Sequence, residues 1–245
     1  MASSNPAARL HQILLRAKTV ESGVSRDLWA RAFDLPSDQT DENMTEVISR
    51  LLQLRKLIEE THDSLKSIEG LHERYFRPFA RLRAIPSVSL GGLNTTDIRG
   101  SLLSITEGDM TVLEFCSEKL ESLHREPIID ESELQNILVE VGALFDDVKT
   151  SSLDPDLKTF ILDGLESIRR GINEFRIRGP IRLKETIAEI IGNVAVNHEI
   201  IKAAEAEPHL QKLRAAFNHL AAVVAFASDS VTLLTAFTGP LLPGG

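Results

Sequence analysis

The chain has 245 residues, of which 42% are hydrophobic, and a formal net charge of −9. A chain of this length can bury a sizeable core in one large domain or two small ones. The negative charge disfavours binding of nucleic acid or anionic lipid by the whole molecule, unless a local basic patch overrides it. The single cysteine, Cys116, excludes an intrachain disulfide and a zinc site built from several cysteines. The N-terminal residues MASSNPAARL lack the pattern of a secretory signal, so a cytoplasmic protein is expected.

The first part of the chain predicts two short helices, at 6–20 and 25–33, followed by a long one. Eleven positions from Met44 to Phe79 follow alternating 3-4 spacing, and nine of them carry an apolar or aromatic residue. This heptad pattern, typical of coiled coils and bundles, indicates one helix of about 40 residues. Pro78 should kink or end it. The candidates for its N-terminal cap are Asp38, Thr40 and Asp41.

Residues 84–107 form the longest stretch without helical periodicity, so an irregular connection is expected there. The most strand-like piece within it is 87–93, which is too short to found a sheet. The connection would separate an N-terminal helical unit, residues 1–83, from a C-terminal helical bundle, residues 108–245. A single continuous domain is the alternative. The helix-breaking residues in this stretch are Pro86, Gly91, Gly92 and Gly100.

Apolar residues recur with helical period in five later segments, which predicts an all-α fold of the elongated multi-helix bundle type. In the turn SSLDPDL, Asp154 is placed to cap a helix and Pro155 to occupy its first position. Gly179 and Pro180 should end one helix and begin the next. The segments are 112–123, 134–148, 157–175, 183–206 and the one that opens at Pro208.

The C-terminal segment is nearly free of charge, since Asp229 is the only charged residue after Arg214. A membrane-spanning helix needs about 20 apolar residues, and an Asp at its centre is disfavoured by about 2.5–3.5 kcal/mol. We therefore expect a largely apolar C-terminal helix that is central to the bundle or associates with another copy. Membrane insertion through residues 215–245 is the alternative. The residues expected on its apolar faces are Phe217, Leu220, Val224, Phe226, Val231, Leu234 and Phe237.

Two basic clusters, at 72–83 and 169–184, together hold ten of the chain's 27 Lys and Arg residues. The plainest interpretation is that these side chains flank a buried aromatic seam and pair with the protein's own carboxylates. Binding of an acidic partner protein is the second interpretation, and nucleic acid or lipid headgroups are less favoured. The candidate partner- or anion-binding residues are Arg74, Arg77, Arg81, Arg176, Arg178 and Arg182.

Three Glu-x-x-His pairs resemble the unit with which di-iron helical bundles hold their metal. Two of the pairs share one predicted helix, ten residues apart, and do not point to one side of it. No metal and no cofactor is therefore expected. The pairs are Glu59/His62, Glu69/His72 and Glu121/His124.

Other signals of catalysis are weak. Arg214 and His219 fit the R-x4–6-H pattern of HEPN ribonucleases, which are also helical, but Arg55 and His62 fit it as well. Phosphate-loop, dinucleotide-binding and nucleophile-elbow motifs are absent. Cys116 lies on an apolar stripe and is expected in the core.

The segment IRRGINEFRIRGPIRLKETIAEIIGN, residues 168–193, resembles part of a group of uncharacterised all-helical bacterial proteins. In those proteins an E-[FY]-R-I-R-G motif joins two long helices. The resemblance implies a bacterial origin and assigns no activity. The residues themselves predict a helix that ends after Arg176 and Arg178, with Gly179 as its C-terminal cap.

The sequence thus favours a non-enzymatic helical interaction protein, a cytosolic subunit, adaptor or regulator that binds copies of itself or another protein. One alternative is a membrane-active bacterial effector, in growth arrest or phage defence, whose C-terminal helix inserts on activation. Another is a HEPN-like ribonuclease that uses Arg214 and His219.

Overall fold

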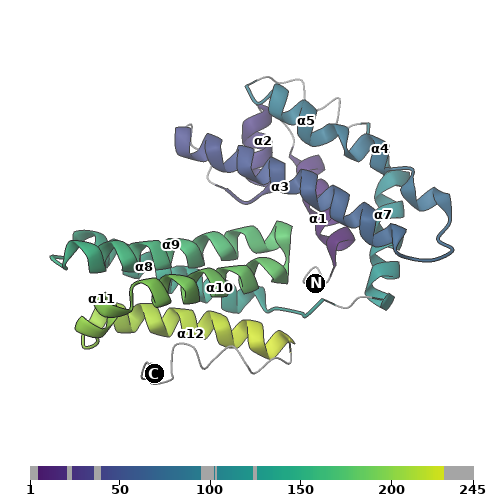
Figure 1. Ribbon diagram of the computed structural model, residues 1–245. Coiled ribbons are helices and arrows are strands. Elements are labelled where there is room, and N and C mark those ends of the chain that lie inside the picture. Colours follow the sequence, from purple (N-terminus) through teal and green to yellow (C-terminus); the bar gives the residue numbers. More distant parts are fainter. Residues whose placement is uncertain are drawn as a thin grey trace. The chain divides into compact units, whose positions relative to one another are not determined.

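The computed structural model describes most of the chain, and every regular element in the described part is a helix. This confirms the predicted all-α class. The chain divides into two compact units, which Figure 1 shows in the colours of the sequence. The division falls between Glu126 and Pro127, and not within 84–107. The described residues are 5–20, 24–35, 40–94, 102, 104–123 and 126–228, excepting the side chains of Glu42, Leu123 and residues 226–228.

The longer helices of the first unit are α1 (Pro6–Thr19), α2 (Ser25–Ala32), α3 (Asp41–Lys66) and α7 (Glu107–Leu123). All four contribute to one hydrophobic core, in which Trp29 is fully buried and stacks on Phe33 with 5.3 Å between ring centroids. Cys116 is also fully buried there, which confirms its predicted place. The remaining described elements are η1 (Glu73–Phe76), α4 (Phe79–Leu82) and α5 (Ala84–Gly91).

The long heptad helix was predicted with the wrong length, because α3 ends at Lys66 after 26 residues. Gly70 takes a left-handed φ of 75°, which an α-helix cannot accommodate. Phe79 is nevertheless buried, on α4, whereas His72 is exposed. The 3-4 spacing therefore marked residues that face the core, but not one continuous helix. At the start of α3, the cap is Thr40, one of the three predicted candidates, and its side chain accepts a hydrogen bond from Asn43 N at 3.2 Å.

The expected irregular connection at 84–107 is also corrected, because its first third forms α5. Pro86 is the third residue of this helix, where a backbone N–H would have no partner within the helix. Pro86 and Ser89 are buried. The glycines that suggested a break end the helix, at Gly91 and its C-cap Gly92.

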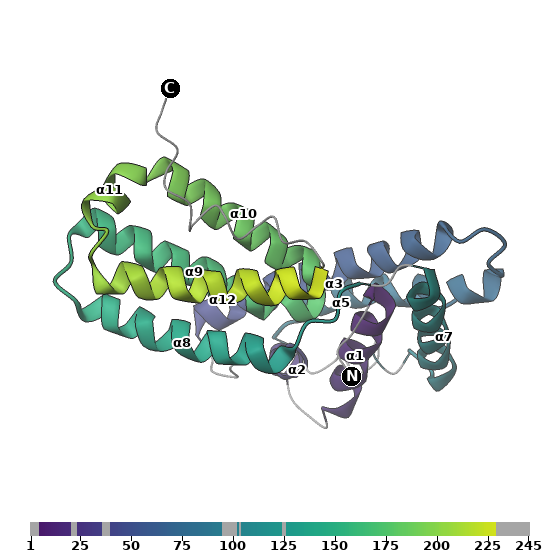
Figure 2. The ribbon, with the colours of Figure 1, turned by 90° about the horizontal axis from the view of Figure 1, so that it is seen from below.

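The second unit contains α8 (Glu131–Thr150), α9 (Pro155–Arg178), α10 (Pro180–Val196), α11 (His198–Ala203) and α12 (Pro208–Ser228). All five contribute to its core, and Figure 2 shows α12 running back from α11 along the unit. Asp130 caps α8 through a hydrogen bond from Ser132 N at 2.9 Å, and Asp154 caps α9 through one from Asp156 N at 3.0 Å. The last residues of α9, from Arg176 onward, group with the first unit.

The apolar side of α12 faces the core of the second unit. Phe217, Leu220 and Val224 are each at most 1% exposed. Their burial fits the interpretation of this segment as a central helix of the bundle. Of the other residues predicted on this helix, Phe226 has an undescribed side chain, and Val231, Leu234 and Phe237 lie outside the described residues.

Candidate functional site

The first basic cluster is largely engaged in contacts within its own unit. Arg81 forms an ion pair with the buried Asp109, next to Thr106. Arg83 donates hydrogen bonds to both carboxylate oxygens of Glu59, at 2.8 and 2.9 Å. The Arg74 guanidinium lies 5.2 Å from the ring centroid of Tyr75. These contacts fit the interpretation in which arginines pair with the protein's own carboxylates.

Asp109 shows the electrostatic effect of this pairing. Burial alone would raise the pKa of its carboxyl, but the hydrogen bonds from Arg81 and Thr106 outweigh burial and hold the pKa below 3.8. The carboxylate accepts hydrogen bonds from Thr106 N and Thr106 Oγ1, both at 2.9 Å. The ionised form is therefore favoured and holds the start of α7 to Arg81.

In the second basic cluster, Arg182 is only 4% exposed and does not present an anion-binding surface. Its Nε donates to the buried Glu174 at 2.6 Å and its Nη1 to Glu189 at 2.9 Å. Arg176 forms an ion pair with Asp34. Among the six predicted binding residues, three are exposed to solvent, namely Arg74, Arg77 and Arg81. Arg176 and Arg178 are half-buried.

The end of the segment E-F-R-I-R-G contacts Arg9, a buried arginine of α1. The Nε of Arg9 donates to the carbonyl oxygen of Ile177 at 3.1 Å, and its guanidinium pairs with Glu126 and Glu60. Gly179 has a left-handed φ of 67°, and a Cβ at this position would overlap the Arg9 guanidinium. The motif glycine is thus required both by its backbone conformation and by its neighbour.

Burial raises the pKa of Glu60 and of Glu126, although Arg9 acts in the opposite direction on both. The exposed Glu60 and the half-buried Glu126 thus flank one buried guanidinium. The groups in contact are Arg9 on α1, Glu60 on α3, Glu126, and the carbonyl group of Ile177 near the end of α9. We interpret this cluster as structural, because the guanidinium is 1% exposed and already contacts three protein groups.

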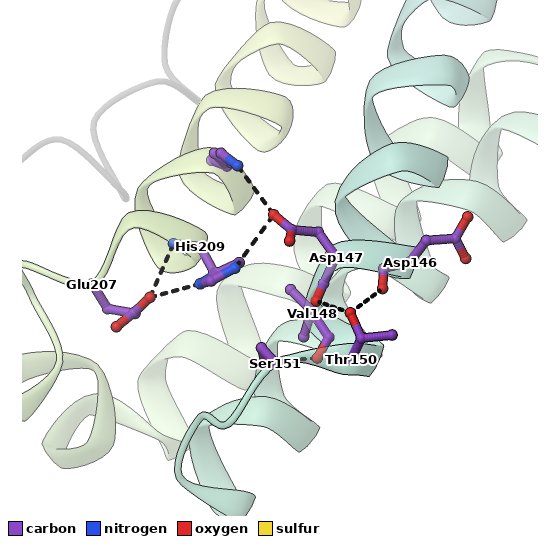
Figure 3. A network of polar contacts seen from close by, with 8 residues as sticks. Asp146, Asp147, Val148, Thr150, Ser151, Glu207 and His209 are labelled. Atoms are coloured by element: carbon purple, nitrogen blue, oxygen red, sulfur yellow. Dashed lines mark hydrogen bonds and ion pairs between the residues drawn. The ribbon is translucent and has the colours of Figure 1, made fainter.

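Polar contacts also connect α8 and α12, as Figure 3 shows at one end of the pair. His209 lies between two carboxylates, with Nδ1 2.6 Å from Glu207 and Nε2 3.4 Å from Asp147. Lys212 Nζ lies 3.3 Å from the same Asp147. The hydrogen bond to His209 lowers the pKa of Glu207 below 4.5. The nearby hydroxyl of Thr150 donates to backbone carbonyl oxygens, so its proton is not directed at His209.

The two residues of the HEPN-like motif are not brought together by α12. His219 contacts Glu133 at 3.1 Å and Glu140 at 3.8 Å, both on α8. Residues five apart on a helix are separated by about 140° around its axis, so Arg214 projects in a different direction. The arrangement holds α12 against α8 at both ends of the pair.

The Glu-x-x-His pairs that the structure describes, Glu59/His62 and Glu69/His72, are not assembled into a metal site. In the part of the chain that the structure describes, no group of three or more His, Cys, Asp or Glu side chains is arranged to hold a metal ion. His72 instead accepts a hydrogen bond from Arg74 N, and His62 Nδ1 lies 3.2 Å from Asp63. His124 lies outside the described residues.

Within the described residues, none of the helices combines the length and the hydropathy needed to cross a lipid bilayer. Residues 229–245, which complete the charge-poor segment, are outside this range.

One side of α10 carries exposed apolar or small residues, with Glu185 among them and Lys184 beside them. Val196 is 82% exposed and Ile181 is 54% exposed. Ala188, Gly192 and Ala195 are also exposed, and the seven-residue spacing of 181, 188 and 195 puts these positions on one side. We call these five residues the α10 face. No charged residue occurs from 190 to 197.

Comparisons with protein-family models, with curated proteins and with solved structures found no match. The α10 face is therefore identified only by the exposure of its residues. Sequence reasoning missed the α10 face, because a nearly continuous apolar run does not reveal which of its sides is covered. The absence of charge from 190 to 197 was the available signal.

Proposed function

We propose that the protein is a non-enzymatic helical interaction protein whose α10 face binds a protein partner, in the first instance a second copy of the chain. The observation that carries the proposal is the exposure of Val196 and Ile181 on a helix whose opposite side is buried. Burial of apolar surface contributes about 25 cal/mol per Å2, so covering such a face favours association.

The neighbouring polar groups support a protein partner over a small anionic ligand. Arg182, the most buried arginine of the second cluster, donates hydrogen bonds to Glu174 and Glu189. The side of α10 that carries Gly192 and Ala195 has small residues, which allow close approach of a partner helix. A role as a subunit, adaptor or regulator follows from such a surface.

The two alternatives have less support. A ribonuclease site at Arg214 and His219 would need a histidine free to act on RNA, whereas His219 contacts Glu133 and Glu140. For a membrane-active effector, the segment that matters most is 229–245, outside the described residues. We therefore favour association.

The test compares the dimer dissociation constants of the wild-type chain and two valine variants, measured by light scattering across a dilution series. Val196→Glu places a charge on the α10 face and should weaken self-association by about tenfold or more, equivalent to about 1.4 kcal/mol. The control is Val139→Glu on α8, where the valine is 66% exposed but outside the α10 face. Equal effects of the two substitutions would argue against the α10 face as the binding surface.

A further inference from the structure

We propose that Arg9 couples the unfolding of the two units, because its guanidinium holds the chain at the places where it passes from one unit to the other. The chain passes between the units at 126/127, 175/176 and 179/180. Residues 176–179, the last turn of α9 and the glycine that follows it, belong to the first unit. This coupling does not depend on self-association through the α10 face.

The guanidinium of Arg9 contacts the chain beside each of these three crossings. Its Nη1 forms an ion pair with Glu126, the last residue before the first crossing. Its Nε donates to the carbonyl oxygen of Ile177 at 3.1 Å, two residues past the second crossing. At the third crossing a Cβ on Gly179 would overlap the guanidinium, so the backbone of this glycine packs directly against it. Arg9 therefore fixes all three parts of the chain within the first unit.

The bond to Ile177 caps the C-terminus of α9. The last carbonyl groups of an α-helix have no N–H partner within the helix, and the helix dipole makes this end electronegative. Because α9 ends at Arg178, the carbonyl group of Ile177 is one of these groups. A buried guanidinium satisfies this carbonyl and complements the dipole. A helix that contributes to the core of the second unit is thus capped by a residue of α1 in the first.

The end of α9 also contributes to two hydrophobic cores. Ile177 is 3% exposed and belongs to the core of the first unit, whereas Phe175 is 5% exposed and belongs to that of the second. Arg176, which lies between them, forms an ion pair with Asp34 just after α2. When the first unit unfolds, the last turn of α9 loses its core contact, its ion pair and its cap together. Fraying that continues by one residue then reaches Phe175.

The contact between Arg9 and α9 is unfavourable to break locally. The guanidinium is 1% exposed, and a buried charge that loses its partners is strongly destabilising. Local opening at the end of α9 would break the bond to Ile177 while Arg9 stays buried in the core around α1. Release of the end of α9 is therefore expected together with unfolding of the whole first unit.

The experiment follows urea unfolding of the full-length chain in dilute solution, with one reporter in each unit. Trp29 is the only tryptophan of the chain and lies in the core of the first unit, so its fluorescence reports on that unit. Pulsed amide hydrogen exchange of residues 131–150, read by mass spectrometry, reports on α8 in the second unit. Wild type should give two coincident curves, because the units unfold together.

Arg9→Gln should allow the first unit to unfold alone. The m-value scales with the surface that unfolding exposes, and the two units are of similar length. The m-value of the Trp29 transition should therefore fall by about half relative to wild type. A lower midpoint with an unchanged m-value would mean that Arg9 only stabilises the first unit, and it would overturn the coupling. Curves that already differ in wild type would overturn it as well.

The matched control is Arg50→Gln on α3. Arg50 is also a buried arginine of the first unit, at 2% exposed, but its ion pair is with Glu46 of the same helix. Arg50→Gln should lower the urea midpoint, leave the m-value unchanged and keep the two reporters coincident. A fall in the m-value as large as that of Arg9→Gln would show that the effect is not specific to Arg9 and would overturn the proposal.

A second variant covers the case in which Arg9→Gln leaves both units unfolded in water. Arg9→Lys keeps the charge but lacks the planar fork that reaches Ile177 and Glu126 together. Its Trp29 transition should show a reduced m-value, and an m-value equal to that of wild type would overturn the coupling. If Arg9→Gln unfolds the first unit in water while residues 131–150 stay protected, the units are already uncoupled, as proposed.

Discussion

Both the backbone conformation and the packing at position 179 require a glycine. Its φ of 67° is one that alanine adopts at a cost of about 1 kcal/mol, and the Arg9 guanidinium occupies the place of a side chain. Gly179→Ala should therefore lower the free energy of unfolding by about 2 kcal/mol or more, measured by chemical denaturation. The control is Gly142→Ala in α8, where a Cβ meets no neighbour within 4 Å. That substitution should stabilise by about 0.5–1 kcal/mol.

The single carboxyl of Asp109 makes the free energy of unfolding depend on pH. Its pKa in the folded state lies below the ordinary value of 3.8, so it contributes stability above that pH and loses it as the pH falls through the folded value. Asp109→Asn should lower the free energy of unfolding by about 1–2 kcal/mol at pH 7, where the carboxylate is ionised. The difference from wild type should shrink below pH 3.8, and a constant difference at acid pH would contradict this account. Asp163→Asn, at an exposed position on α9, is the matched control.

At the scale of elements, α9 and α10 approach closely where Gly171 meets Thr186. A Cβ on Gly171 would overlap Thr186 Oγ1, which donates to the Arg182 carbonyl at 3.0 Å. Gly171→Ala should therefore destabilise the protein by about 1–3 kcal/mol. Adding Thr186→Ala removes the overlapping hydroxyl, so the double variant should lose less stability than the sum of the single variants in a denaturation cycle. Simple additivity would contradict this contact.

The elements also show which features could be predicted from sequence. Helix starts were predicted well, because Thr40 and Asp154 cap locally and need no tertiary information. The end of α3 was missed, since heptad spacing continues past Gly70 while the backbone does not. The contact of Arg9 with Ile177 joins residues 168 positions apart, and periodicity within a helix carries no information about such pairs. For Arg182 the sequence favoured pairing with the protein's own carboxylates, but it did not identify Glu174 and Glu189 as the partners.

At the scale of the whole molecule, the chain forms two helical units whose arginines pair largely with carboxylates of the same unit, and α10 carries exposed apolar residues. Val196 belongs to a part of the sequence that predicted a helix but not which side of it would be covered. The predicted function, helix-mediated association, remains a proposal that this surface supports.

The most direct test is the molar mass of the full-length wild-type protein, measured by sedimentation equilibrium over a wide range of concentrations. We expect the mass to rise reversibly above the 27.1 kDa of one chain, and Val196→Glu to shift this rise to higher concentration. A mass that stays at 27.1 kDa at every concentration would contradict self-association through the α10 face.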